Sequence, residues 1–112
     1  MSEKPAELVR KLISKYIPTK PRKITLKLDW DRKASLIEVM GENIDEKIEY
    51  KETVDFTSFA KGVIEAYKQA YGELKVIPVS FREEIYENDK VSLNLYPTGN
   101  LGIFEIFIDY ET

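Results

Sequence analysis

The chain has 112 residues, of which 43% are hydrophobic and 33% are charged, and this length and composition predict one globular domain spanning residues 1–112. The absence of histidine and cysteine excludes Ser-His-Asp and Cys-His catalysis, imidazole or thiolate zinc sites, and disulfides. The N-terminus has no signal-peptide pattern, and no apolar run is long enough to span a membrane. We therefore expect a soluble, cytoplasmic protein.

The net charge of −3 conceals an uneven distribution along the chain. Residues 1–33 carry ten Lys or Arg and four acidic residues, whereas residues 34–112 carry seven basic and sixteen acidic residues. This asymmetry predicts a surface with opposed charges, one side of which steers a charged partner.

The N-terminal third begins with an amphipathic helix in this interpretation. Its apolar stripe recurs at helical spacing and consists of Leu8, Val9, Leu12, Ile13, Tyr16 and Ile17. Pro5 lies in the first turn, where a missing N–H is tolerated, and Pro18 ends the helix.

A three-stranded meander is predicted next. Apolar and polar residues alternate over 23–30, and the polar run 31–34 turns the chain. If the numbers of paired residues add up to 65, which we call the pairing sum, Leu28 lies opposite Ile37. A third strand is predicted around residues 47–54, with a pairing sum of 87.

The second predicted helix is capped by Asp55, Thr57 or Ser58 and ends at Gly72. Gly62 inside it costs about 1 kcal/mol relative to alanine and indicates a close approach of the helix to the sheet.

After this helix we expect a strand over residues 74–79, in which Pro78 indicates an edge or a strand end. Residues 80–88 are interpreted either as one helical turn, from the capping-box spacing of Ser80 and Glu83, or as a loop.

The C-terminal hairpin turns at Gly99-Asn100, which fixes a pairing sum of 199. One face of this hairpin is then entirely apolar. The opposite face is mixed and aromatic, either partly covered or exposed for contact, and pairs Ser92 with Phe107, Asn94 with Glu105, and Tyr96 with Ile103.

The predicted fold class is therefore α+β, with an antiparallel sheet of about five to six strands. Along the chain, the elements are a helix, the meander, the second helix, a strand and the C-terminal hairpin. We expect the two main helices to pack on one face of the sheet.

Carboxylates are the only acid–base groups present in quantity, with pairs at Asp29/Asp31 and Asp109/Glu111 and a cluster at Glu83, Glu84, Glu87 and Asp89. Oxygen ligands suit Mg²⁺ or Ca²⁺, so a carboxylate-metal enzyme is one hypothesis. No EF-hand loop, phosphate-binding loop or nucleophile elbow accompanies them. We therefore expect each acidic pair to be a solvated or a partner-facing surface, with no enzyme activity, no metal and no cofactor.

Basic residues near the N-terminus form an alternative site. Six of them are candidates for contacts with nucleic-acid phosphates: Lys20, Arg22, Lys23, Lys27, Arg32 and Lys33. The acidic overall balance and the lack of a base-stacking signature weigh against nucleic acid as the main ligand. A homodimerising structural domain that pairs through an exposed strand edge is a further alternative.

Three stretches resemble the YezG-like immunity proteins, which are antitoxins of secreted bacterial nuclease toxins. Residues 8–18 followed by 23–28 are similar to that family's opening helix, Ile-Pro exit and first strand. Residues 55–72 match its second helix in position, and residues 91–111 resemble its closing hairpin. The resemblance implies a protein that neutralises a toxin by direct binding.

We therefore expect a protein-binding module, either a monomer or a homodimer, that occludes a basic toxin domain, with nucleic acid and membrane both disfavoured as partners. Complementary charge favours association with a basic nuclease, and aromatic anchors hold the complex. The predicted partner-binding residues lie in the acidic C-terminal region: Glu83, Glu84, Glu87, Asp89, Asp109, Tyr110 and Glu111.

Overall fold

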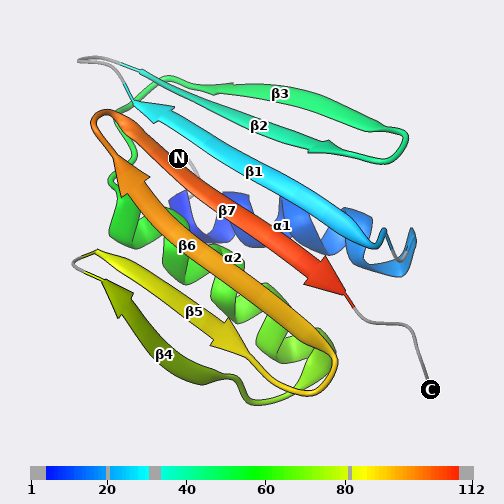
Figure 1. Cartoon of the computed structure of the whole chain (residues 1–112). Helices are drawn as coiled ribbons and strands as arrows, with labels where there is room; N and C mark the ends of the chain where they lie inside the picture. Colours follow the sequence, from blue (N-terminus) through cyan, green and yellow to red (C-terminus); the bar gives the residue numbers. More distant parts are fainter. Residues whose placement is uncertain (1–4, 20, 31–33, 81, 109–112) are drawn as a thin grey trace.

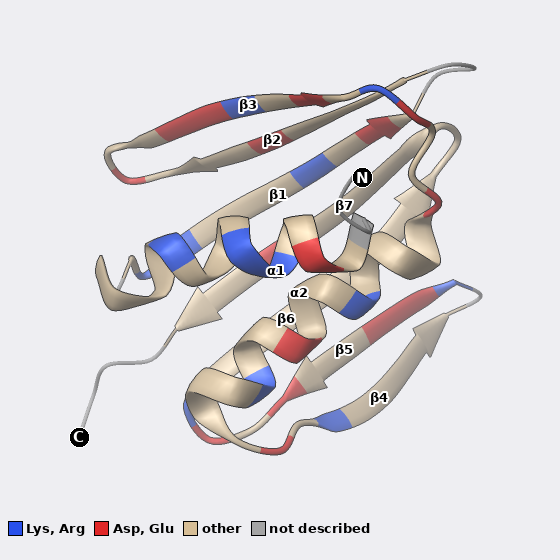
Figure 2. Ribbon diagram, turned by 180° about the vertical axis from the view of Figure 1, so that it is seen from behind, with Lys and Arg blue, Asp and Glu red and all other residues tan. Residues whose placement is uncertain are grey.

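A seven-stranded antiparallel sheet carries two helices on one of its faces (Figures 1 and 2). The computed structural model describes residues 5–19, 21–30, 34–80 and 82–108. The helices are α1 (Pro5–Tyr16), the short 3-10 turn η1 (Ile17–Thr19) and α2 (Phe56–Tyr71). The strands are β1 (Lys23–Trp30), β2 (Ser35–Gly41), β3 (Ile44–Tyr50), β4 (Lys75–Ser80), β5 (Glu83–Glu87), β6 (Val91–Thr98) and β7 (Leu101–Ile108). The α+β class is confirmed, but the predicted count of five to six strands is wrong.

The last strand of the chain lies in the middle of the sheet. The strand order is β3-β2-β1-β7-β6-β5-β4, so two meanders, β1–β3 and β4–β7, join through the pairing of β1 with β7 (Figure 1). Because both neighbours of β7 are hydrogen-bonded to it, its backbone has no free edge.

Two predicted registers are confirmed. Leu28 pairs with Ile37, and the C-terminal hairpin follows the sum of 199 along its whole length, from Val91 opposite Ile108 to Thr98 opposite Leu101. Gly99 has a φ of 59°, the left-handed conformation that a two-residue hairpin turn requires.

The third strand begins earlier than predicted, and its register is shifted by two residues. Ile37 pairs with Ile48 rather than with Tyr50, because the chain turns tightly at residues 42–43. Asn43 has a φ of 61°, and asparagine tolerates this conformation well. A shift of two keeps the same side chains on the same face, so the predicted apolar side of β3 is retained.

Residues 83–87 form strand β5, so the prediction of a helical turn or a loop between residues 80 and 88 is wrong. A tight turn at residues 89–90 folds β5 back onto β6, and the N–H of Asn88 donates to the carbonyl oxygen of Val91 at 3.0 Å. The expected edge strand before it is confirmed as β4, which contains Pro78.

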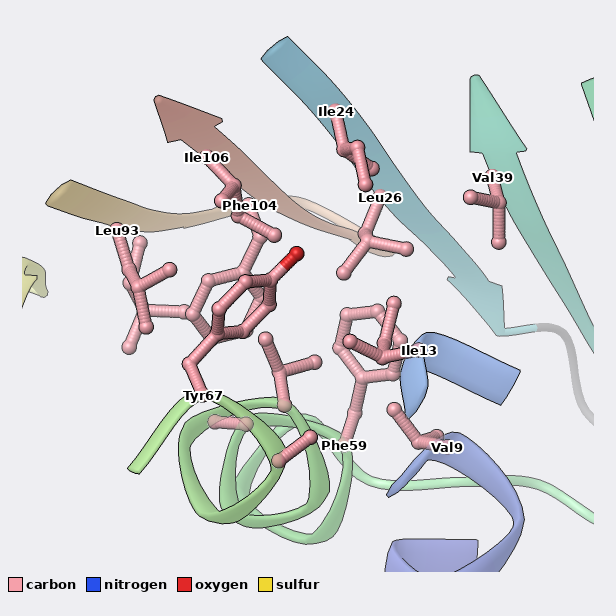
Figure 3. Packing of buried hydrophobic residues seen from close by; sticks show 14 of the residues in the cluster. Val9, Ile13, Ile24, Leu26, Val39, Phe59, Tyr67, Leu93, Phe104 and Ile106 are labelled. Atoms are coloured by element: carbon pink, nitrogen blue, oxygen red, sulfur yellow. The ribbon is translucent and has the colours of Figure 1, made fainter. Parts of the chain in front are cut away.

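The hydrophobic core fills the layer between the helices and the sheet (Figure 3). Val9 and Ile13 of α1 and Phe59 and Tyr67 of α2 are fully buried against strands β1, β6 and β7. The cap of α2 is Asp55, whose Oδ2 accepts a hydrogen bond from the N–H of Ser58 at 3.4 Å, so one of the three predicted caps is selected. The helix ends at Gly72 as predicted, with a φ of 93°.

Gly62 marks a close approach of the two helices, not of a helix and the sheet as predicted. A Cβ atom at this position would lie 2.5 Å from the carbonyl oxygen of Ala6 and 3.0 Å from Cβ of Val9. The glycine therefore lets α1 and α2 lie side by side on the sheet, as Figure 2 shows.

Candidate functional site

The sheet has one face covered by helices and one face that no helix of the described residues covers (Figure 1). Alternation along each strand sends successive side chains to opposite faces. On β1, Ile24, Leu26 and Leu28 point to the helices and are fully buried, so Lys23 and Lys27 lie on the other side. We call this second side the open face.

The central strand is apolar on both of its faces. Gly102, Phe104, Ile106 and Ile108 face the helices and are buried. Three of the four open-face residues of β7 are also apolar, and we call them the β7 strip: Leu101, Ile103 and Phe107. Phe107 is 46% exposed, which is high for a phenylalanine in the middle strand of a sheet.

A polar network crosses the β7 strip at Glu105. Its Oε1 accepts a hydrogen bond from the hydroxyl of Tyr96 on β6 at 2.9 Å, and its Oε2 lies 3.8 Å from Nζ of Lys23 on β1. The same Nζ lies 5.3 Å from the centre of the Phe107 ring, which is cation–π geometry. Burial, followed by the hydrogen bond to Glu105, raises the pKa of Tyr96 above its ordinary value, so the hydroxyl stays protonated and donates near neutral pH.

Charge is distributed differently on the two sides of the molecule. The open face carries seven acidic residues and four lysines, whereas the helices carry five basic and two acidic residues (Figure 2). The acidic residues of the open face are Asp29, Glu38, Asp45, Glu49, Glu83, Glu87 and Glu105. The open face therefore has three more acidic than basic residues, and the helices have three more basic than acidic ones, while Glu46 and Glu84 of the strands also point to the helix side. This division does not follow the one along the chain, because Lys23 and Lys27 lie on the acidic face and α2 lies in the basic helix layer.

The predicted partner-binding residues do not form one continuous patch. Glu83 and Glu87 lie on the open face of β5, and Asp89 is exposed in the following turn. Glu84 points to the opposite side, where its Oε1 accepts a hydrogen bond from the hydroxyl of Tyr86 at 3.0 Å. The remaining three predicted residues, Asp109, Tyr110 and Glu111, lie outside the described part of the chain.

An open depression of about 360 Å³ lies at the end of the sheet where Asp89 is found. Its lining combines the β5–β6 turn with the ends of β6 and β7: Asn88, Asp89, Lys90, Val91, Ser92, Phe107 and Ile108. The depression therefore brings one predicted acidic residue to the same place as the exposed ring of the β7 strip.

The predicted basic site is divided in a similar way. Arg22 is exposed, and Lys23 and Lys27 lie on the open face, where Lys27 is the register neighbour of Glu38 and Lys23 of Phe107. Lys20, Arg32 and Lys33 lie outside the described residues. The lysines of β1 are thus interleaved with carboxylates, in contrast to the continuous basic stripe typical of nucleic-acid-binding surfaces.

One exposed apolar feature was missed in the sequence. On the edge strand β4, Val76, Ile77 and Val79 are 51%, 37% and 51% exposed. The sequence pattern is that of an ordinary half-buried strand, and it does not show that the side chains of this edge strand stay so exposed. Ile77 lies on the open face, and Val76 lies on the helix side.

Among the described residues, no group of three or more acidic side chains is arranged to hold a metal ion, and no helix is long and apolar enough to cross a membrane. Comparison of the chain with family models, curated proteins and solved structures found no significant match in any of the three. The class of protein that the fold and this surface define is an α+β domain with an open, acidic and aromatic sheet face.

Proposed function

We propose that this chain is a protein-binding module, an immunity or antitoxin-like inhibitor that neutralises a basic toxin by covering its active surface. The observation that carries the proposal is the excess of carboxylates on the open face, opposite a basic helix layer. A nuclease is the preferred class of target, because a surface built to bind phosphates is attracted to carboxylates. The resemblance to YezG-like immunity proteins supports this target and a cytoplasmic location.

In this proposal Glu83, Glu87 and Asp89 steer and hold the basic partner, while nearby aromatic side chains supply the contact area. Glu84 has a smaller part, because its carboxylate points away from the open face and is engaged by Tyr86. Asp109, Tyr110 and Glu111 stay in the proposal on the sequence alone, because they lie in the acidic C-terminal part of the chain.

The test is capture of the partner from a lysate of the native host by the whole chain, followed by identification and an assay of the captured protein. We expect a basic protein whose nuclease activity is inhibited by the chain. The double variant Glu83→Lys/Glu87→Lys is expected to weaken capture at least tenfold. The matched control Glu7→Lys/Glu65→Lys makes the same change in net charge on the exposed side of the helices and is expected to leave capture within about twofold.

A captured protein that is acidic, or that the chain does not inhibit, would overturn the proposed function. Equal weakening by both double variants would show that only net charge matters, and it would remove the acidic open face from the site.

A second candidate function, a homodimerising structural domain, is favoured by the apolar edge strand β4. An exposed apolar edge is a template for pairing with another strand. Against this, Pro78 has no N–H to donate, and the register between Pro78 and Ser80 is irregular, both of which limit edge pairing. Sedimentation of the purified chain tests this candidate, which predicts a dimer that Val76→Lys converts to a monomer.

A further inference from the structure

We infer that the open face of β7 is the docking site for a cationic amphipathic helix of the partner protein. The inference rests on the proposed function, because it specifies how the same acidic face holds its partner. A strand with apolar side chains on both faces is typical of a sheet that is covered on both sides. In this chain α1 and α2 cover one side of β7, and the β7 strip of Leu101, Ile103 and Phe107 is left for a partner.

The position of the β7 strip decides which kind of segment fits it. The backbone of β7 is paired with β1 on one side and with β6 on the other, so a partner strand has no main-chain groups to pair with there. The partner must therefore pack by its side chains. A helix is about 10 Å across, which matches about two strand spacings of 4.8 Å and spans the strip from β1 to β6.

The side chains next to Phe107 leave its ring accessible. Ser92 of β6 is the register neighbour of Phe107, and Thr25 and Asn94 flank Glu105 on either side. These short polar residues do not extend over the ring of Phe107, which keeps 46% of its surface exposed even with Lys23 beside it. An apolar stripe on the docked helix would bury this exposed surface.

Charge selects a cationic helix. Beyond the short side chains of β6, strand β5 presents Glu83 and Glu87. On the other side, Lys23 and Lys27 of β1 lie between the strip and Glu38 of β2. Lys or Arg residues on the β5 side of the helix would reach Glu83 and Glu87, so the docked helix carries its positive charge mainly on that side. A second copy of this chain is a poorer occupant, because it would bring the same acidic excess against itself.

The test uses the whole chain, labelled with ¹⁵N, and a synthetic probe of about five helical turns in which leucines form one face and lysines the other. A control probe has the same composition in an order that forms no apolar face. We expect the first probe to bind at least tenfold more tightly than the control probe. Its amide shift changes should map to β7 and to the adjacent parts of β1 and β6.

Phe107→Ser is expected to weaken binding of the probe at least tenfold, as does loss of a central aromatic anchor in other interfaces. The matched control is Val76→Ser, because Val76 is 51% exposed but lies at the edge of the sheet, and we expect a change within about twofold. If Phe107→Ser perturbs folding, a second variant takes its place. Ile103→Thr keeps the branched shape of the side chain and is also expected to weaken binding of the probe.

Equal binding of the two probes, or shift changes on β4 or on the helices, would overturn the inference. Self-association of the unliganded chain that Phe107→Ser abolishes would overturn it in favour of a second copy. If Glu83→Lys/Glu87→Lys abolishes capture of the basic partner but Phe107→Ser leaves it intact, the proposed function stands and the docking site is wrong. If the captured partner is not basic, the proposed function is wrong, and the docking site that rests on it loses its basis.

Discussion

A Cβ atom on Gly102 would lie 2.2 Å from Cδ1 and 2.4 Å from Cε1 of Phe56. Gly102 is buried on the helix side of β7, and Phe56 is the first residue of α2. The ring of Phe56 stacks on Phe104, with centroids 6.1 Å apart, and its centroid lies 6.4 Å from that of Trp30. The missing side chain at Gly102 therefore lets the start of α2 lay an aromatic ring directly on the sheet.

Gly102→Ala is expected to destabilise the fold by about 2–3 kcal/mol, because an added methyl group in a closely packed site forces the ring and the backbone apart. Chemical denaturation measures the change. In a Phe56→Ala background the same substitution should be nearly neutral, since the obstructing ring is gone. Equal losses in both backgrounds would show that the contact with Phe56 is not the cause.

Gly62→Ala tests the contact between the helices and has two opposing effects. Alanine in place of glycine inside a helix stabilises by about 1 kcal/mol. At this position, however, the new methyl group meets the backbone of α1, with the carbonyl oxygen of Ala6 only 2.5 Å away. We expect the clash to prevail, with a net loss of about 1–2 kcal/mol. Gln69→Ala, at an exposed position of α2, serves as the control and should be nearly neutral, whereas a rise in Tm for Gly62→Ala would contradict the prediction.

Asn88 connects the end of α2 to the β5–β6 turn. Its Nδ2 donates to the carbonyl oxygens of Tyr71 and Glu73 at 3.0 and 3.2 Å, and its Oδ1 accepts from the N–H groups of Lys90 and Val91 at 2.8 and 3.1 Å. The side chain thus satisfies main-chain groups on two separate elements.

We expect Asn88→Ala to destabilise the fold by about 2–3 kcal/mol, at roughly 0.5–1.5 kcal/mol for each hydrogen bond and less where the group is reached by water. Asn88→Asp keeps the acceptor and loses the donor, so its loss should be intermediate. Asp89→Ala, in the same exposed turn, is the control. Thermal unfolding of the three variants gives the comparison, and equal stability of Asn88→Ala and Asp89→Ala would contradict the role of the side chain.

Local signals in the sequence predicted the elements whose structure depends on neighbouring residues. Gly99 set the turn of the last hairpin, and the two-residue alternation then gave every pair of β6 and β7. Strand β5 escaped prediction because three of its five residues are glutamates and its alternation is obscured. Its strand conformation comes from pairing with β6 after the turn that Asn88 holds.

The candidate site was only partly predictable for a related reason. An acidic surface follows from counting residues, but the grouping of Glu83 with Glu87, and the separation of Glu84 from both, depends on β5 being a strand. The pairing of β1 with β7 is a contact between distant segments that no local pattern encodes. That pairing puts Phe107 in the middle of the sheet.

Tyr16 and Glu46 tie the end of α1 to the edge strand β3. The hydroxyl of Tyr16 donates to Oε1 of Glu46, and Nζ of Lys15 lies 2.9 Å from the same oxygen. The hydrogen bond from Tyr16, followed by that from Lys15, lowers the pKa of Glu46 below its ordinary value of 4.5. The hydrogen bond to Glu46 is also the main cause that raises the pKa of Tyr16 above its ordinary value of 10.0.

Because the pKa of Glu46 is lower in the folded state, its ionised form adds stability above pH 4.5, and this contribution is lost as the pH falls through the folded-state pKa. We therefore expect Glu46→Gln to lower Tm by about 2–5 °C at neutral pH, with a deficit that shrinks toward zero in acid. Tyr16→Phe removes the donor to the ionised carboxylate, so its deficit should be present from neutral pH up to pH 10.0 and should also shrink in acid as Glu46 is protonated. Glu49→Gln, on the opposite face of β3, is the control for a change of charge alone. A deficit for Glu46→Gln that stays constant from neutral to acidic pH would show that the ionised carboxylate does not stabilise this end of the sheet.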